Sequence, residues 1–453
     1  MVRYRKGQTY GVHALIAALE VEPPPVPYEL HLARTVEEVA ERVRAGVEAG
    51  RRVLTVWSFY SPDAATAQQE LAQVRAAVLD AQGVLHVAGG VHATAEPLVT
   101  LRAGWDVVAI GEGEATFTGL VEAFSTGADT RDLPGTAHLE ATGALVKGPA
   151  AARHPLDRYP AFPHQRNLTS PIEITRGCVF ACKFCQTPFM FSARFRHRSV
   201  ASVRESVAVM RGRGLRDVRF ITPTSLSYGS PDDGVDLTAV EELLAGVKAE
   251  LGPGGRVFFG SFPSELRPEH VSAEALRMLK RYVANQDVII GAQSGSDDVL
   301  ALSGRGHGAA VVEDAVRLCR QEGFRANVDV IFGMPGEGPE QALQTVALME
   351  RLAALGARIH AHTFMPLPGT PWRNEPPGRI ADPARRALAA MTTSGGVYGS
   401  WARQEAIATR LAGDRSEQAG HRTGRPRRLR AIDETDARPP DPAPDLGSTR
   451  PTR

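Results

Sequence analysis

Hydrophobic residues recur along the first 130 residues in two alternating patterns. From Thr35 to Ala49, valines and alanines stand three or four positions apart, which predicts an amphipathic helix. The short apolar runs at 53–57 and 84–88 predict strands, with further helices near 64–81 and 115–124 and a strand at 106–110. Because strands and helices alternate, we expect a Rossmann-like parallel sheet with helices on both faces.

Two glycine-rich segments follow predicted strands of this series. They are Gly89-Gly90-Val91-His92, expected as a loop, and Gly111-Glu112-Gly113-Glu114, which opens a helix. Ligands of open parallel sheets bind beyond the carboxyl ends of the strands, where both segments are expected. The second segment lacks the third glycine of a dinucleotide fingerprint, and its two carboxylates would repel a pyrophosphate. A tight turn before a helix N-terminus, where Glu is favoured, is the alternative interpretation.

A second series of alternating elements begins near Ile172. Its predicted strands are 172–175, 217–221, 256–260, 288–292, 327–332 and 358–363. Six parallel strands with intervening helices predict a partial (β/α)6 TIM-like barrel, whose active site would lie at the carboxyl strand ends.

These patterns divide the chain into five predicted parts. We expect a Rossmann-like domain at 1–135, a Gly-, Pro- and Ala-rich linker at 136–169, the barrel at 170–375, a helical C-terminal extension at 376–413 and a disordered tail at 414–453. The tail has no Phe, Trp or Tyr, and its basic run is interpreted as solvated rather than bound to a partner.

The amino-acid composition limits which cellular compartment and which kinds of partner are expected. Hydrophobic residues make up 43% of the 453 residues and the net charge is +1, so nothing indicates a nucleic-acid or membrane surface. The sequence shows no secretory signal and no apolar run of membrane-spanning length, so a soluble, cytoplasmic protein is expected.

Three of the four cysteines stand within eight positions. Cys178, Cys182 and Cys185 form a C-x3-C-x2-C motif directly after the first predicted barrel strand. Three thiolates can hold three irons of a [4Fe-4S] cluster and leave the fourth iron open, whereas structural zinc and iron–sulfur sites normally take four protein ligands. A zinc site or three packed thiols are the alternatives, but no second cysteine pair exists. Cys319, on the apolar stripe of a predicted helix, is expected in the core.

The cysteine motif, with Phe184 before its last cysteine, resembles that of the radical S-adenosylmethionine (SAM) superfamily, and the resemblance extends over residues 170–375. The segments at 291–296, 304–307, 329–337 and 362–370 resemble the methylthiotransferase-like branch. The resemblance implies a [4Fe-4S] cluster whose open iron binds SAM and whose electron cleaves it to methionine and a 5′-deoxyadenosyl radical. It also implies SAM contacts at the following strand-end residues: Phe184, Thr222, Thr224, Ser261, Glu265, Gln293, Ser294, Phe332 and Met365.

Two features of the barrel segments leave questions open. Thr222-Pro223-Thr224 departs from the Gly-Gly-Glu type that contacts the SAM amino group in the family. His360 and His362 alternate with Ala361, so both point the same way, either into the pocket or into a polar layer against a helix.

The N-terminal part resembles the cobalamin-binding domain that precedes many radical SAM barrels. The matching residues, which the resemblance implies as the cobalamin contacts, are Gly89, Gly90, His92, Gly111, Glu112 and Gly113. The Asp-x-His-x-x-Gly signature that supplies a cobalt ligand is absent, and His13 in the first loop falls in a predicted helix. No cysteine precedes Cys178, so the auxiliary cluster of methylthiotransferases is not expected.

Three hypotheses follow. The first is a cobalamin-dependent radical SAM enzyme that catalyses methyl transfer or rearrangement. The second is a radical SAM enzyme without cobalamin, and the third is a non-catalytic iron–sulfur sensor. The first two imply an electron donor such as flavodoxin or ferredoxin and a small-molecule substrate that the sequence does not identify.

Overall fold

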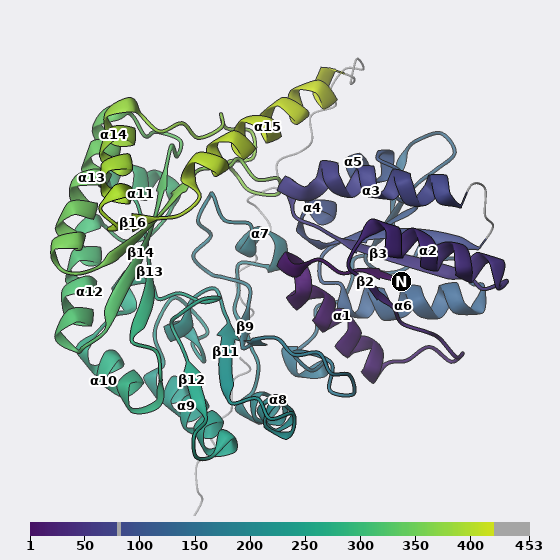
Figure 1. The fold of residues 1–453 in the computed structure, drawn as a ribbon, viewed down its shortest axis with the longest axis horizontal. Coiled ribbons are helices and arrows are strands. Elements are labelled where there is room, and N and C mark those ends of the chain that lie inside the picture. Colours follow the sequence, from purple (N-terminus) through teal and green to yellow (C-terminus); the bar gives the residue numbers. More distant parts are fainter. Residues whose placement is uncertain (79–82, 421–453) are drawn as a thin grey trace, which may run out of the picture. The chain divides into compact units, whose positions relative to one another are not determined.

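The computed structural model describes residues 1–78 and 83–420, with side chains through residue 413 (Figure 1). Residues 1–412 form one compact unit. None of the described helices is both long and apolar enough to cross a lipid bilayer.

The N-terminal part is a seven-stranded sheet in the order β2-β1-β3-β4-β5-β6-β7. Strands β1 to β5 are parallel, and β6 and β7 are antiparallel. The strands are β1 (Val2–Arg3), β2 (Leu32–Ala33), β3 (Val53–Ser58), β4 (Val84–Gly89), β5 (Val107–Ala109), β6 (Thr136–Leu139) and β7 (Leu145–Lys147). The helices are α1 (Thr9–Val21), α2 (Val36–Glu48), α3 (Ala64–Ala77), α4 (Gly90–Ala95), α5 (Pro97–Arg102) and α6 (Glu114–Thr126).

Helices cover both faces of this sheet, as the sequence predicted (Figure 1). On one face α1 and α6 pack together over Val2 and Val56. On the other face α2, α3 and α5 cover Trp57, Ala88 and Val108. Each face is therefore an apolar layer, and the Rossmann-like fold is confirmed.

Two local expectations in this part were wrong. The segment after β4, expected as a loop, begins the short helix α4. The segment expected as a linker begins with the hairpin β6–β7, which extends the sheet past residue 135. These strands are three or four residues long and separated by a turn at Gly143, so they are too short to show a strand periodicity. The domain boundaries remain a prediction.

The second β/α series forms a curved parallel sheet in two segments, in the orders β12-β11-β8 and β13-β14-β15-β16. The backbone N–H of Ile289 donates to the carbonyl of Gly260 at 2.8 Å and links the two segments. The strands of this sheet are β8 (Ile172–Glu173), β11 (Asp217–Ile221), β12 (Arg256–Phe258), β13 (Asp287–Gln293), β14 (Arg325–Phe332), β15 (Arg358–Thr363) and β16 (Val397–Tyr398). The strands β9 (Thr175–Arg176) and β10 (Arg196–His197) form a separate antiparallel pair. All six predicted strands are present, and the partial barrel is confirmed.

Helices cover the outer face of this sheet (Figure 1). The helices of this part of the chain are α7 (Thr187–Phe191), α8 (Val200–Gly212), α9 (Leu237–Leu251), α10 (Ala273–Tyr282), α11 (Asp297–Ser303), α12 (Ala309–Gln321), α13 (Pro339–Ala354), α14 (Asp382–Thr393) and α15 (Trp401–Gly420). Cys319 is fully buried in α12, as expected. Single-turn 3-10 helices lie at Lys6–Gln8, Ser61–Asp63, Leu156–Arg158, Ser225–Ser227 and Pro268–His270.

The C-terminal extension differs from the expectation in two places. Besides α14 and α15 it contains β16, which pairs with β15 and adds a seventh parallel strand to the series. Helix α15 continues to Gly420, so residues 414–420 are helical rather than disordered. The rest of the predicted tail, 421–453, lies outside the described residues.

A buried ion network connects the N-terminal sheet to the barrel. Arg176, two residues before the cysteine motif, lies 2.9 Å from Glu112, 2.6 Å from Glu114 and 2.6 Å from Glu173. Arg196 also pairs with Glu112. The neighbouring carboxylates raise the pKa of Arg176 well above its ordinary value despite its burial, which opposes the charge. The network therefore holds the loop after β5 against the start of the cysteine loop.

We predict that Arg176→Ala lowers the free energy of unfolding by about 3–5 kcal/mol, because it leaves buried carboxylates without their cation. Urea denaturation of the full chain measures this. Arg131→Ala is the matched control, because Arg131 pairs with Asp129 in an exposed position and its removal should leave the transition nearly unchanged. Equal transitions for the two variants would contradict a structural role for the network.

Candidate metal and cofactor site

The three cysteines line one cavity of about 330 Å³ at the carboxyl ends of the barrel strands. Ligand pockets of proteins begin at about this size. The other lining residues are Phe180, Phe184, Thr187, Pro188, Thr222, Pro223, Thr224, Phe262, Pro263, Ser264, Glu265, Arg267, Ile289, Gln293, Arg305 and Asp329.

The cysteine loop is held by its backbone. Gly177 has φ +84°, and a Cβ at this position would collide with the carbonyl of Arg194, so the position requires glycine. The N–H of Cys178 donates to Ser192 at 3.2 Å, and that of Lys183 to Ser303 at 2.9 Å. The loop therefore presents its thiols to the cavity in a fixed arrangement.

Burial makes the thiols reluctant to ionise without a cation. It raises the pKa of Cys178 to about 11, and the neighbouring Cys185 and Cys182 add to the increase. Burial also raises the pKa of Cys185. A cluster of buried thiols suits a cationic metal centre, because a bound metal stabilises thiolates.

A buried arginine stands beside the thiols. The Arg305 guanidinium lies with Nη1 3.8 Å from Cys182 Sγ and donates from Nη2 to the carbonyl of Gly291 at 2.6 Å. Glu265 lies 3.6 Å from the same guanidinium. Burial raises the pKa of Glu265, although the charge of Arg305 opposes the increase. Arg267 stacks over Phe180 with 3.5 Å between the guanidinium carbon and the ring centroid.

The structure brings together five of the predicted SAM contacts. Phe184, Thr222, Thr224, Glu265 and Gln293 line the cavity with the cysteines. Gln293 has φ +74° at the end of β13, a conformation that a non-glycine residue adopts at a cost and that often marks functional sites.

Four predicted SAM contacts do not line the cavity: Ser261, Ser294, Phe332 and Met365. Phe332 was placed wrongly, because side chains alternate along β14 and Phe332 is buried in the core under the helices. Ser294 is fully buried, with its hydroxyl 3.3 Å from Thr345 on α13. Arg267 and Asp329, which were not predicted, take part in the lining. Asp329 belongs to the segment 329–337, which resembles the methylthiotransferase-like branch, whereas no motif in the sequence pointed to Arg267.

The candidate cobalamin residues lie at the carboxyl ends of β4 and β5, as expected. Gly90 has φ +85°, and a Cβ there would come within 2.7 Å of Ser58 Oγ. His92 is buried in α4, with Nδ1 3.0 Å from Ser61 Oγ, and burial lowers its pKa to about 4. Glu112 is paired with Arg176 and Arg196.

Two further histidines have defined surroundings. His13 is packed in α1 with Nε2 2.8 Å from the hydroxyl of Tyr4, and burial lowers its pKa to about 4. His362 points to the same side of β15 as His360, toward Asp329, and away from the helix-covered face that contains Ala361. Of the two positions considered, the structure gives the polar layer against a helix, because His362 Nδ1 lies 3.1 Å from Gln404 on α15. Asp329 beside them lines the cavity, whereas the two histidines do not.

Residues 172–349 match the sequence model of the radical SAM superfamily. This part of the chain is a radical SAM domain. It contains the three cysteines and most of the strand ends that surround the cavity.

Solved structures extend the likeness to the N-terminal sheet. The radical SAM methyltransferase TsrM from Kitasatospora setae, solved with cobalamin and a [4Fe-4S] cluster, aligns with 81% of this chain and 71% of its own at a TM-score of 0.61 and 20% identity. The cobalamin-dependent SAM radical enzyme OxsB, solved with aqua-cobalamin and SAM, aligns with 94% of this chain and 55% of its own at a TM-score of 0.62 and 15% identity. At these identities the likeness shows a shared fold.

Curated relatives are similar over part of their length. A tRNA-2-methylthio-N(6)-dimethylallyladenosine synthase from Pelobacter propionicus is 29% identical over 48% of this chain and 47% of its own. An uncharacterized methyltransferase from Pyrococcus horikoshii is 26% identical over 64% of this chain and 62% of its own. The chain thus spans between about half and two thirds of these relatives.

We predict that the free energy of unfolding decreases as pH falls from about 6.5 to about 4, partly through His13. The unfolded histidine takes up a proton near its ordinary pKa of 6.5, whereas the buried one resists until about 4. The contribution of His13 to the free energy of unfolding is therefore fully present above pH 6.5 and is lost by about pH 4. Urea titrations across this range should show a smaller pH slope for His13→Gln than for wild type. His31→Gln, at a position where 38% of the side chain is exposed, is the control, and an unchanged slope for His13→Gln would contradict the prediction.

Proposed function

We propose that the protein is a radical SAM enzyme in which Cys178, Cys182 and Cys185 hold a [4Fe-4S] cluster and SAM occupies the adjoining cavity. The single observation that supports this most strongly is the convergence of the three thiols on one cavity. Among the described residues, that cavity's lining contains no fourth cysteine and no histidine. A three-thiol site leaves one iron open for a ligand, whereas a closed structural zinc or iron–sulfur site requires a fourth protein ligand.

The surroundings of the thiols fit this cluster. The Arg305 guanidinium faces Cys182 Sγ and would donate a hydrogen bond to the thiolate, and it also offsets part of the negative charge of three thiolates. When bound, the cluster supplies the electron for reductive cleavage of SAM. Burial of the site and hydrogen bonds to sulfur are the means by which the chain tunes the potential of such a cluster.

The remaining cavity residues provide contacts that suit SAM. Phe184 offers an aromatic ring that can pack against adenine, and Thr222 and Thr224 bring polar groups to the end of β11. Glu265 and Asp329 supply carboxyl groups for polar atoms of the cofactor or substrate. Phe180 and Phe262 make part of the wall apolar, which helps to exclude water from the site.

The N-terminal sheet adds a proposed cobalamin site at the carboxyl ends of β4 and β5. The fold shared with TsrM and OxsB supports it. Gly89 and Gly90 would let the backbone approach the corrin closely. The buried His92 is held beside Ser61, so we propose cobalamin bound without a protein imidazole on cobalt. The reaction would then be methyl transfer or rearrangement on a small molecule, with flavodoxin or ferredoxin as the electron donor.

Anaerobic reconstitution with iron and sulfide tests the cluster assignment. The wild-type chain should bind about four irons and produce 5′-deoxyadenosine from SAM with dithionite. The variant with Cys178→Ala, Cys182→Ala and Cys185→Ala should lose at least about 100-fold of this turnover, because no ligands remain for the irons. Cys319→Ala, which removes a thiol from the core of α12, is the matched control. Turnover by the triple variant at the wild-type rate would end the enzymatic proposal.

Retention of cobalamin separates the first two hypotheses. Protein reconstituted with cobalamin and then desalted should keep a cob(II)alamin absorption spectrum in about one equivalent. Substituting Gly90→Val should abolish retention, because its Cβ would meet Ser58 Oγ and the backbone of Phe59. SAM cleavage without any retained cobalamin would favour the radical SAM enzyme that lacks a corrin.

A further inference from the structure

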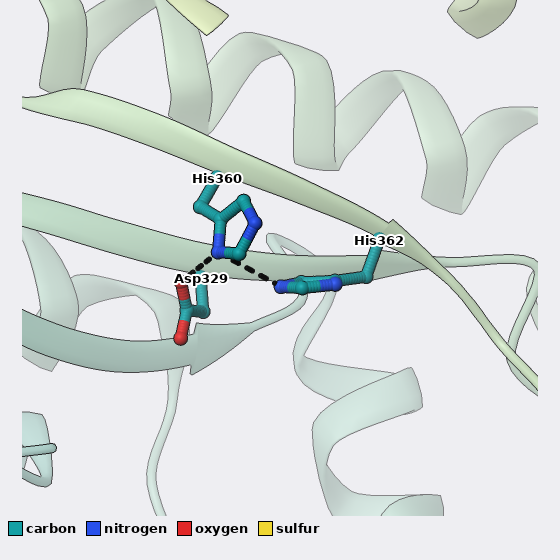
Figure 2. Close-up of side chains that lie close together, drawn as sticks. All are labelled: Asp329, His360 and His362. Atoms are coloured by element: carbon teal, nitrogen blue, oxygen red, sulfur yellow. Dashed lines mark hydrogen bonds and ion pairs between the residues drawn. The ribbon is translucent and has the colours of Figure 1, made fainter. Parts of the chain in front are cut away.

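A second group of metal-ligating side chains lies on the inner side of the barrel sheet. Asp329 on β14 and His360 and His362 on β15 direct one ligand atom each toward a common point (Figure 2). The three atoms lie within 4.8 Å of one another. They point away from the face on which Val328, Val330 and Ala361 pack against the helices.

Register and packing place these side chains. Asp329 is the direct partner of His360 across the parallel pair β14–β15, and His362 follows two positions later on the same side. The ring of Tyr398 stacks on that of His360, with centroids 4.6 Å apart and planes 7° from parallel. The group is therefore built on strands, with His360 held by an aromatic neighbour.

One ring nitrogen, Nδ1 of His360, connects the three side chains. His360 Nδ1 lies 3.1 Å from Asp329 Oδ1 and also 3.1 Å from His362 Nε2. A ring nitrogen carries either one proton or one lone pair. If Nδ1 is protonated, its one proton is shared between Asp329 Oδ1 and His362 Nε2, and if Nδ1 is unprotonated, its lone pair faces a lone pair of the carboxylate. A cation among the three atoms turns all of these lone pairs into ligands.

The separations match those of metal ligands. Two ligand atoms each about 2.1 Å from an ion and about 90–110° apart are about 3.0–3.4 Å from each other. The two contacts of His360 Nδ1, each 3.1 Å long, fall in this range. Two imidazoles and one carboxylate are a ligand set for zinc and for divalent iron, and they leave coordination positions open.

We propose that Asp329, His360 and His362 form a divalent transition-metal site, separate from the three cysteines, beside the SAM cavity. Asp329 also lines that cavity, so the proposed site adjoins the space where a substrate would bind. A substrate with a carboxylate, hydroxyl or amine would coordinate there and be oriented beside the cofactor. This proposal goes beyond cluster and SAM binding, and a metal bound here does not depend on either.

Gln404 on α15 supplies a sensitive test. Its amide oxygen accepts from the N–H of Thr363 at 3.0 Å, and its Nε2 lies 3.1 Å from His362 Nδ1. When His362 Nε2 binds a metal, the ring proton lies on Nδ1 and faces this amide nitrogen, so the amide has to turn. A carboxylate at position 404 would accept from both N–H groups, as in the carboxylate–histidine–zinc arrangement.

Zinc binding to the full chain tests the proposal. The cysteines are first occupied by reconstituting the cluster anaerobically, and Zn2+ is then titrated against a fluorescent zinc indicator. Wild type should bind about one Zn2+ per chain in addition to its iron. His362→Ala and Asp329→Ala should weaken this binding by at least about 10-fold, and Gln404→Glu should tighten it by about 10-fold. His31→Ala, which removes a histidine whose side chain is 38% exposed, is the control for incidental histidine binding.

Two further readouts keep the test decisive. Iron content equal to wild type shows that each variant retains the fold of the barrel. In the triple cysteine-to-alanine chain, Co2+ should give weak d–d bands without the sulfur-to-cobalt charge-transfer band that thiolate ligands produce. The proposal is overturned if wild type binds no additional Zn2+, or if its affinity is the same in wild type, His362→Ala and Gln404→Glu.

Discussion

Three thiols buried in one cavity are the constraint on which the rest of the site depends. Burial raises the pKa of Cys178 to about 11, and the neighbouring Cys185 and Cys182 add to the increase. The arrangement is stable as three neutral thiols or as three thiolates around a cation, and the Arg305 guanidinium at 3.8 Å from Cys182 favours the second state. The glycine at 177, which no larger residue can replace without a backbone collision, lets the loop form this arrangement.

The topology explains why the other chemical groups gather around the thiols. In a parallel sheet the carboxyl ends of all strands meet at one edge, so residues from β11, β13 and β14 come together although they are far apart in sequence. The N-terminal sheet also presents its strand ends to this region. Glu112 and Glu114, which follow β5, pair with Arg176 just before the cysteine loop. These ion pairs thus join the N-terminal sheet to the barrel between the proposed cobalamin site and the cysteine loop.

Much of the fold could be predicted because the spacing of hydrophobic residues in the strongly apolar strands and amphipathic helices is visible in the sequence. The exceptions are short or depend on distant pairing. The hairpin β6–β7 has strands of three or four residues, and β16 exists only because β15 provides a partner. The cysteines and Cys319 could be assigned from spacing and context. Phe332 could not, because which side of β14 faces the cavity depends on how the helices pack, and Arg267 enters the site only through the folding of the β12–α10 connection.

The electron paramagnetic resonance spectrum of the reduced, reconstituted chain, recorded with and without SAM, tests the central claim most directly. If the three cysteines leave one iron open to the cavity, SAM coordinates that iron, and the spectrum of the reduced [4Fe-4S] cluster changes its g values when SAM is added. An identical spectrum in saturating SAM, or a protein that binds zinc and no iron through these cysteines, would contradict the account.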